Sequence, residues 1–279
     1  MFWKKDVLFC DINPTCYAIS LQKEIGKRHI KDFLSKEKFA KTMSKQPLPH
    51  VITNHSSGVI KRGKGIDLTL QENKRTNIML ACKKLNGLII YPGEVFSFWK
   101  LVGNTTKRKG YLDGRVIEGN KIKPGIGGGL CNLGHTINWL VQHSPLDVIE
   151  FHKHSDALAP DHGERIPFTS GTSVSYNNID YRFKNNTDQP IQLLIWCDEE
   201  NLHGELRSER EFPWRYQITE ENHHFEKEGD TYYRISKIYR ETFVKQSGER
   251  IEKKLIVDNH SEVMFDYDLI PQEQILKKS

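Results

Sequence analysis

Apolar and polar positions repeat along this chain with two different periods, and each period predicts a different kind of element. Apolar residues three or four positions apart predict helices over residues 17–43, 71–85 and 131–143. The third of these carries Leu133, Ile137 and Leu140 on one broad face. Short apolar runs between Gly, Pro, Asn or Asp predict strands instead. We expect strands at residues 51–53, 88–91, 115–118, 121–123, 147–152, 173–184, 191–197, 201–206, 230–244 and 250–257.

The order of these elements predicts an α+β fold. Mixed helices and short strands surround a glycine loop followed by a helix, and the C-terminal part is β-rich. Two prolines in residues 45–50 interrupt the pattern and place the first boundary there. We expect a charged helical N-terminal extension at residues 1–49, a central domain at 50–211 and a β-hairpin C-terminal extension at 212–279.

The predicted N-terminal helix has a broken apolar stripe that includes Ile19, Ile30 and Phe33, together with many lysines. We interpret it as a helix that packs on the central domain. The alternative is a helix that lies on a membrane surface, which would give the chain a peripheral membrane contact. No window of the sequence approaches the roughly 18 apolar residues of a membrane span, so none is expected.

Composition narrows the partners and the compartment. The 41 basic and 36 acidic residues leave a net charge of +5, and the basic residues are scattered, so no nucleic-acid partner is expected. The five cysteines are odd in number and irregular in spacing, which argues for reduced thiols rather than a disulfide framework. No signal peptide is recognisable near Met1, so we expect a cytoplasmic location and leave action after export open.

One cysteine stands directly behind a run of glycines, in the segment KPGIGGGLCN. If a helix begins near Cys131, its macrodipole would favour the thiolate and lower the pKa of the thiol. Gly127, Gly128 and Gly129 have no side chains to screen their N–H groups, which could donate to an oxyanion, as could Asn132. This layout is typical of a cysteine acyl-transfer enzyme. The competing interpretation is a small buried cysteine after a tight turn.

A nucleophilic thiol needs a base, and two histidines follow on a predicted strand. His152 and His154 lie two residues apart, so on a strand they would share one face, and either could take the proton from Cys131. We expect no cofactor. Zinc is the alternative, because Cys131 with His135, His152 and His154 also suits a metal site that keeps one position open. Spacing singles out none of the nearby carboxylates, Asp156, Asp161, Glu164 and Asp180.

Four motifs, in the order YPGEVFSFWKLVG, KPGIGGGLCN, HKHS and YRFKNNTDQPI, resemble the VanW family over about residues 65–205. The resemblance implies a role in glycopeptide (vancomycin) antibiotic resistance and in peptidoglycan metabolism of the cell wall. From some exported members it also implies L,D-transpeptidase-like chemistry on a peptidoglycan-type peptide substrate. It assigns Cys131 as the nucleophile, residues 127–129 as the substrate loop, and His152 and His154 as candidates for the base.

Two residues depart from the family pattern. Asn132 stands where the family usually has glutamine, and Gly171 stands where it usually has an aspartate that would orient the histidine.

The sequence leaves three candidate functions open. The first is a cysteine-dependent acyltransferase that forms a thioester at Cys131. The second is a non-catalytic accessory protein that binds a peptidoglycan precursor or a resistance partner, and the third is a Cys/His metal-site module.

Overall fold

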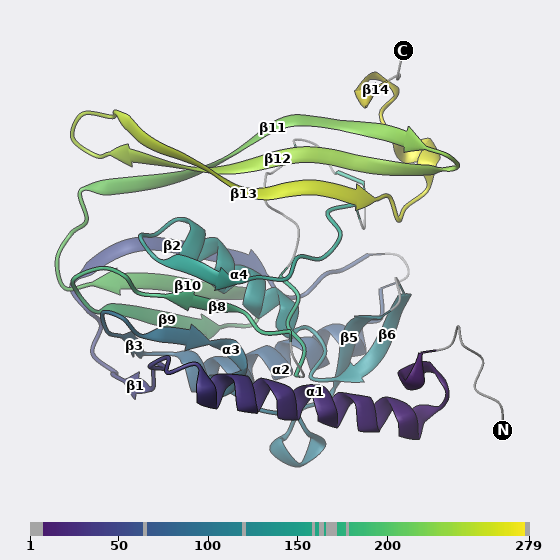
Figure 1. Ribbon diagram of the computed structural model, residues 1–279, viewed down its shortest axis with the longest axis horizontal. Coiled ribbons are helices and arrows are strands. Elements are labelled where there is room, and N and C mark those ends of the chain that lie inside the picture. Colours follow the sequence, from purple (N-terminus) through teal and green to yellow (C-terminus); the bar gives the residue numbers. More distant parts are fainter. Residues whose placement is uncertain are drawn as a thin grey trace.

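The computed structural model describes residues 8–63, 66–118, 121–157, 160–161, 165, 172–176 and 179–276. The fold is α+β, as predicted, with a mixed body and a long β-sheet above it in the view of Figure 1. Glu164 and Gly171 lie outside the described residues. The helices of the described part are α1 (Pro14–Leu34), α2 (Leu68–Leu85), α3 (Phe98–Val102), α4 (Leu130–Gln142) and the 3-10 helices Phe9–Asp11, Lys107–Lys109, Tyr267–Leu269 and Gln272–Gln274.

The strands of the described residues form four sheets, in the orders β1-β3-β9-β10-β2, β13-β12-β11-β14, β4-β8-β7 and β5-β6. We call the first of these the main sheet and the second the C-terminal sheet. The strands are β1 (Thr42–Met43), β2 (His50–Gly58), β3 (Leu88–Ile90), β4 (Val95–Ser97), β5 (Asp113–Glu118), β6 (Lys121–Ile126), β7 (Asp147–Glu150), β8 (Arg182–Lys184), β9 (Ile191–Cys197), β10 (Asn201–Ser208), β11 (Trp214–Glu228), β12 (Thr231–Val244), β13 (Arg250–Glu262) and β14 (Ile275–Leu276).

The antiparallel main sheet is covered on one face by α2 and α4, which also contact each other. The close approach of α4 depends on Gly204 of β10, where an added Cβ would stand 2.7 Å from the Leu140 side chain. The apolar stripe predicted for α4 is confirmed, because its members are fully buried in the core between helices and sheet. This core fixes where α4 begins and therefore where Cys131 lies.

The helix α1 is attached to the body by ion pairs rather than by its apolar side chains. Arg182 of β8 donates two hydrogen bonds to the buried Asp32, at 2.6 and 3.0 Å. The predicted packing of the apolar stripe on the central domain is therefore wrong for most of its length, and the membrane-surface alternative stays a hypothesis. The exposed large apolar residues of α1 are Tyr17, Ile19, Ile30, Phe33 and Leu34.

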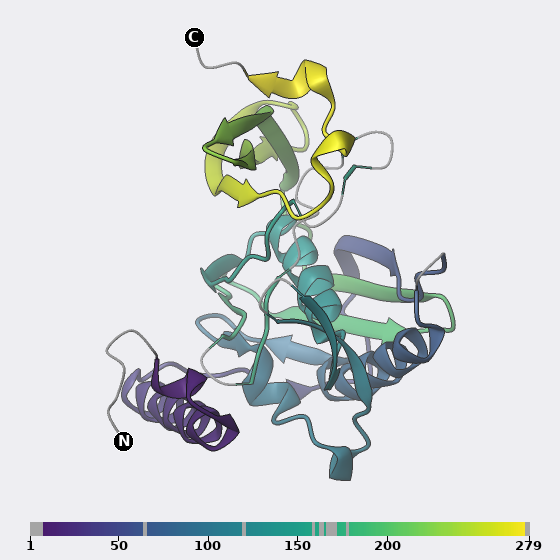
Figure 2. The same cartoon turned by 90° about the vertical axis from the view of Figure 1, so that its right-hand side faces the viewer.

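The C-terminal sheet consists of three long antiparallel strands, β11, β12 and β13, with β14 added parallel to β11. Figure 2 shows this sheet curling on itself above the body. The predicted hairpin of residues 230–244 and 250–257 is confirmed as β12 and β13. The strand β11 was not predicted, because its sequence, WRYQITEENHHFEKE, is too polar to form an apolar run.

Two predicted boundaries are wrong for physical reasons. The N-terminal helix ends at Leu34 rather than residue 43, because Ala40 donates its N–H to the Val95 carbonyl and Phe39 bridges to the same residue in the body. The strand predicted over residues 173–184 is reduced to β8, which pairs with both β4 and β7.

Candidate functional site

The glycine loop forms a tight turn between β6 and α4. The Gly127 N–H donates to the Leu112 carbonyl and the Gly128 N–H donates to the Gly125 carbonyl, each at 3.0 Å. These two amides are therefore occupied, contrary to the prediction that they face an oxyanion. The first turn of α4 has no side-chain cap, and within the described chain the N–H groups of Gly129 and Leu130 donate to no acceptor. The N–H groups of the last loop glycine and of the first helical residue are therefore the ones left to bind an acceptor.

At each of the three loop positions, a side chain larger than that of glycine would clash with a neighbouring segment. Gly129 has a φ of +99°, and a Cβ there would meet Cγ of Lys74 at 2.2 Å. A Cβ on Gly128 would meet the backbone of Gly114 at 2.3 Å, and one on Gly127 would meet the side chain of a threonine at 2.8 Å. The glycines therefore allow other segments to approach α4 closely.

A fully buried asparagine of α2 holds this loop in place, and the sequence did not reveal it. The Asn77 Nδ2 group donates to the carbonyls of Leu112 and Gly128, both at 3.0 Å. Its Oδ1 accepts the Leu112 N–H at 2.8 Å. One side chain thus connects α2, the start of β5 and the glycine loop. An asparagine inside a helical pattern carries no sequence signal for such contacts.

Cys131 lies in the first turn of α4 and is half-buried. Its Sγ donates a hydrogen bond to the Val174 carbonyl at 3.7 Å. Burial raises the pKa of the Cys131 thiol, while hydrogen bonding with the backbone of Val174 and of Cys131 itself lowers it in part. The sequence predicted a lowered pKa at this helix N-terminus, and the prediction is wrong because desolvation is the largest effect. The resting group is a thiol.

His154 meets the same segment as Cys131. Its Nδ1 lies 3.0 Å from Oγ of Ser173, the residue before Val174. Burial lowers the pKa of His154, so its imidazole is neutral at pH 7 and able to accept a proton. The segment itself is fixed by the Ser173 N–H, which donates to the His152 carbonyl at 2.7 Å. Ser173 thus holds the imidazole, a role the sequence did not assign to it.

His152 has different partners from His154. The sequence predicted that both histidines share one face of a strand, and this is wrong because β7 ends at Glu150, before either histidine. The His152 Nε2 atom lies 3.2 Å from Oε1 of Glu150, and that carboxylate also accepts two hydrogen bonds from Arg28 of α1. His152 is therefore part of the charged contact with α1.

His135 of α4 is buried in an environment that includes two other histidines. Its pKa is lowered to about 4, first by burial and then by the charges of His55 and His154. His55 of β2 stacks on Trp139 at 4.3 Å between ring centroids, one helical turn further along α4. His55 of the main sheet and His154 are thus both near enough to His135 for their charges to lower its pKa.

The remaining predicted polar residues are distributed unevenly. Oδ1 of Asn132 is buried and has no hydrogen-bond partner among the residues that the structure describes. Asp180 accepts hydrogen bonds from Ser97 and Arg182, and Asp156 accepts one from Arg165, so neither carboxylate orients the candidate base. Among the described residues, no group of three or more His, Cys, Asp or Glu side chains is arranged to hold a metal ion. The zinc site stays a hypothesis.

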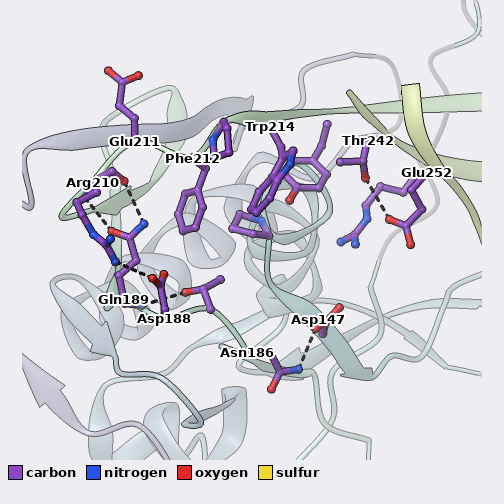
Figure 3. A pocket seen from close by; sticks show the side chains of 15 residues that line it. Asp147, Asn186, Asp188, Gln189, Arg210, Glu211, Phe212, Trp214, Thr242 and Glu252 are labelled. Atoms are coloured by element: carbon purple, nitrogen blue, oxygen red, sulfur yellow. Dashed lines mark hydrogen bonds and ion pairs between the residues drawn. The ribbon is translucent and has the colours of Figure 1, made fainter. Parts of the chain in front are cut away.

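A separate groove lies between the body and the C-terminal sheet. Its volume is about 680 Å³, and Figure 3 shows Phe212 and Trp214 beside the ion pair of Arg210 with Asp188. None of the predicted site residues lines it. Among the described helices, none combines the length and the apolar composition that a membrane span requires.

Comparison with known proteins gives these residues a context. A family model described as VanW like protein matches residues 73–207. The chain is 30% identical over 228 residues to vancomycin B-type resistance protein VanW of Enterococcus faecalis (strain ATCC 700802 / V583), covering 81% of this chain and 82% of that protein. It is also 29% identical over 122 residues to the uncharacterized protein YoaR of Bacillus subtilis (strain 168). This match covers 44% of this chain and 39% of that protein. No solved structure matches. The region matched by the family model contains the glycine loop, α4, His154 and Ser173. The chain belongs to the VanW family.

Proposed function

We propose that this protein serves glycopeptide (vancomycin) resistance and peptidoglycan metabolism as a cysteine-dependent acyltransferase on cell-wall peptides. The name of the Enterococcus faecalis relative supports the resistance role. The observation that carries the chemistry is the convergence of Cys131 and His154 on adjacent residues, Val174 and Ser173.

In the proposed reaction His154 takes the proton of the Cys131 thiol while Sγ attacks the carbonyl carbon of a substrate amide. The oxyanion accepts hydrogen bonds from the first-turn N–H groups of α4. The imidazolium then gives its proton to the amine nitrogen as the C–N bond breaks, which leaves a thioester on Cys131. An acceptor amine attacks this thioester and passes a proton to His154, which returns it to the departing sulfur.

The two pKa shifts suit proton transfer in concert with attack. Burial raises the pKa of Cys131 and lowers that of His154, so both groups are neutral before substrate binds. A resting ion pair is therefore disfavoured. A positioned base contributes about 10²–10⁴-fold to such a step. His154 is assigned as the base, because His152 is held by Glu150.

The test is turnover of a peptidoglycan-type stem peptide with an amine acceptor, followed by mass spectrometry. Cys131→Ser should lower the rate by about 10³-fold or more and abolish the acyl-enzyme adduct, by comparison with nucleophile replacements in other enzymes. Cys197→Ser is the matched control, because that thiol is also half-buried and lies outside the site. His154→Gln should slow acylation, whereas His152→Gln should not. An unchanged rate in Cys131→Ser contradicts the proposal.

One observation favours the accessory function instead. The raised pKa of Cys131 means that the free protein has no activated thiolate. An accessory protein would bind a peptidoglycan precursor or a resistance partner without turnover. Alkylation of the native protein by iodoacetamide separates the two functions. If a stem peptide accelerates alkylation of Cys131, the site activates its thiol on binding; if binding persists in Cys131→Ser and turnover is never seen, the accessory function holds.

A further inference from the structure

The helix α1 carries an apolar stripe that is open to solvent. Ile30 is 63% exposed, Phe33 is 87% exposed and Leu34 is 68% exposed. These residues stand at positions i, i+3 and i+4, so their side chains are neighbours on the helix surface. Ile19, which is 54% exposed, precedes Ile30 by about three helical turns and continues the same stripe. Contiguous exposed apolar residues of this kind mark an interaction surface.

The opposite side of α1 binds the body. Arg28 donates two hydrogen bonds to Glu150 of β7, at 2.7 and 2.5 Å. Asp32 accepts two hydrogen bonds from Arg182 of β8. Ile30 is two residues from both Arg28 and Asp32, which places it about 200° around the helix from them. The ion pairs therefore hold α1 on the outside of the body, where Figures 1 and 2 show it, with its apolar stripe turned outward.

The charges of α1 are divided between the same two sides. Its two acidic residues lie toward the body, where Asp32 is buried and Glu24 is half-buried. Lys23, Lys27 and Lys31 are exposed and stand four residues apart, so they form a row along one edge of the apolar stripe. Lys27 pairs with Glu24 at 2.7 Å, whereas Lys23 and Lys31 form no ion pair within the described residues. The outward side is therefore apolar and positively charged.

This combination fits an anionic membrane surface better than a second copy of the chain. Lysines beside an apolar stripe match a layer that presents phosphate groups above hydrocarbon. Two copies of this face would instead bring rows of lysines together without an outward carboxylate to pair with them.

We propose that α1 binds the surface of an anionic phospholipid membrane and lies in its plane. Ile30, Phe33 and Leu34 enter the boundary between headgroups and acyl chains, and Lys23 and Lys31 contact the headgroup phosphates. The ion pairs of Arg28 and Asp32 then hold the body at the membrane surface. The proposal rests on α1 alone and does not depend on acyl transfer at Cys131.

The experiment is co-sedimentation of the full chain with vesicles of phosphatidylglycerol and phosphatidylcholine, and with vesicles of phosphatidylcholine alone, at pH 7. We expect binding to the anionic vesicles to be at least about 10-fold stronger, and to weaken as salt is added. Ile30→Gln with Phe33→Gln should weaken it at least about 10-fold, because two large apolar side chains are lost. Lys23→Gln with Lys31→Gln should weaken it about 10-fold or more.

The C-terminal sheet offers matched controls for both pairs of substitutions. Ile251→Gln with Leu255→Gln replaces two exposed apolar residues of β13. Lys245→Gln with Lys254→Gln removes the same net charge from exposed positions. Both control variants should bind the anionic vesicles like wild type.

A second readout separates insertion from attraction by charge alone. Phe33→Trp keeps an aromatic side chain on the stripe, so it should bind like wild type, shift its fluorescence to shorter wavelength on anionic vesicles and be quenched by brominated lipids. The proposal is overturned if anionic vesicles do not bind, if Ile30→Gln with Phe33→Gln binds like wild type, or if the controls weaken binding equally. Unquenched Phe33→Trp on vesicles also overturns it, as does a lipid-free dimer that Ile30→Gln with Phe33→Gln dissociates.

Discussion

The main sheet and the C-terminal sheet are held in place by different forces. The main sheet shares one continuous apolar core with α2 and α4. Among the described residues, the C-terminal sheet contributes to two small apolar clusters, and buried ions join it to the chain below it. Arg165 donates to Asp156 and Glu220, each at 2.5 Å, and Arg234 donates to the Asp156 carbonyl at 2.8 Å. Apolar packing tolerates changes of pH and salt, whereas buried ion pairs fail when one partner is lost.

The strongest test of this comparison is Arg165→Met. It removes the cation that pairs with both buried carboxylates, Asp156 and Glu220, and breaking a buried pair costs about 3–5 kcal/mol. Burial already raises the pKa of Asp156, so its protonation should relieve part of the loss at pH 5. We expect hydrogen exchange in β11–β13 to increase while α4 stays protected.

The matched control is Arg210→Met, which breaks the exposed pair with Asp188. An exposed pair contributes at most about 1 kcal/mol, so little change is expected. Equal exchange in Arg165→Met and Arg210→Met would mean that the buried ions do not hold the C-terminal sheet.

The apolar side of the comparison is tested by Leu140→Ala. Leu140 is fully buried where α4 meets β10, so its truncation should cost about 2–5 kcal/mol and destabilise the main sheet and the site together. Urea unfolding measures the loss. Leu34→Ala on the exposed face of α1 is the control, and its effect should stay within about 0.5 kcal/mol. Equal losses in the two variants would contradict a core centred on α4.

The smallest expected effect concerns pH. The pKa of His135 falls from an ordinary 6.5 in the unfolded chain to about 4 in the fold. Between these values the unfolded chain binds a proton that the folded chain does not, so stability decreases as pH falls from about 6.5 to about 4. The loss of stability reaches about 3 kcal/mol only at the acid end of this window, near pH 4, and is much smaller near pH 6.

We expect His135→Gln to flatten the decrease of the melting temperature over this window, measured by differential scanning calorimetry at intervals of pH. His29→Gln, on the exposed face of α1, should leave the profile unchanged. An identical slope in wild type and His135→Gln would show that acid acts elsewhere, for example on the ions of the C-terminal sheet.

The sequence predicted the elements whose pattern reflects a single buried face. The helix expected at residues 131–143 matches α4, because Leu133, Ile137 and Leu140 all pack on the sheet. Periodicity failed where tertiary contacts override it, as at Phe39, which pairs with the body instead of continuing α1. It also failed for the polar strand β11.

The sequence predicted only those residues of the candidate site that lie next to one another in the chain. Cys131 and the glycines are adjacent in sequence, so their motif was visible. The side chains that contact this motif and His154 come from other parts of the sequence: Lys74 and Asn77 from α2 lie against the glycines, and Ser173 lies against His154. Nothing in their local sequence distinguishes them, and burial, which reverses the expected pKa shift of Cys131, is likewise a property of the folded chain.

The hydrogen bonds of Asn77 with Leu112 and Gly128 have a consequence for the order of folding. Its hydrogen bonds join residues 35 and 51 positions apart in sequence, and the glycine loop takes its shape only with those contacts made. Closing such long loops is entropically unfavourable before the surrounding core forms. We therefore expect the glycine loop to take its final shape late, after α2 and the β5–β6 hairpin have docked, so that a nascent chain presents Cys131 without its surrounding structure until most of the central domain has folded.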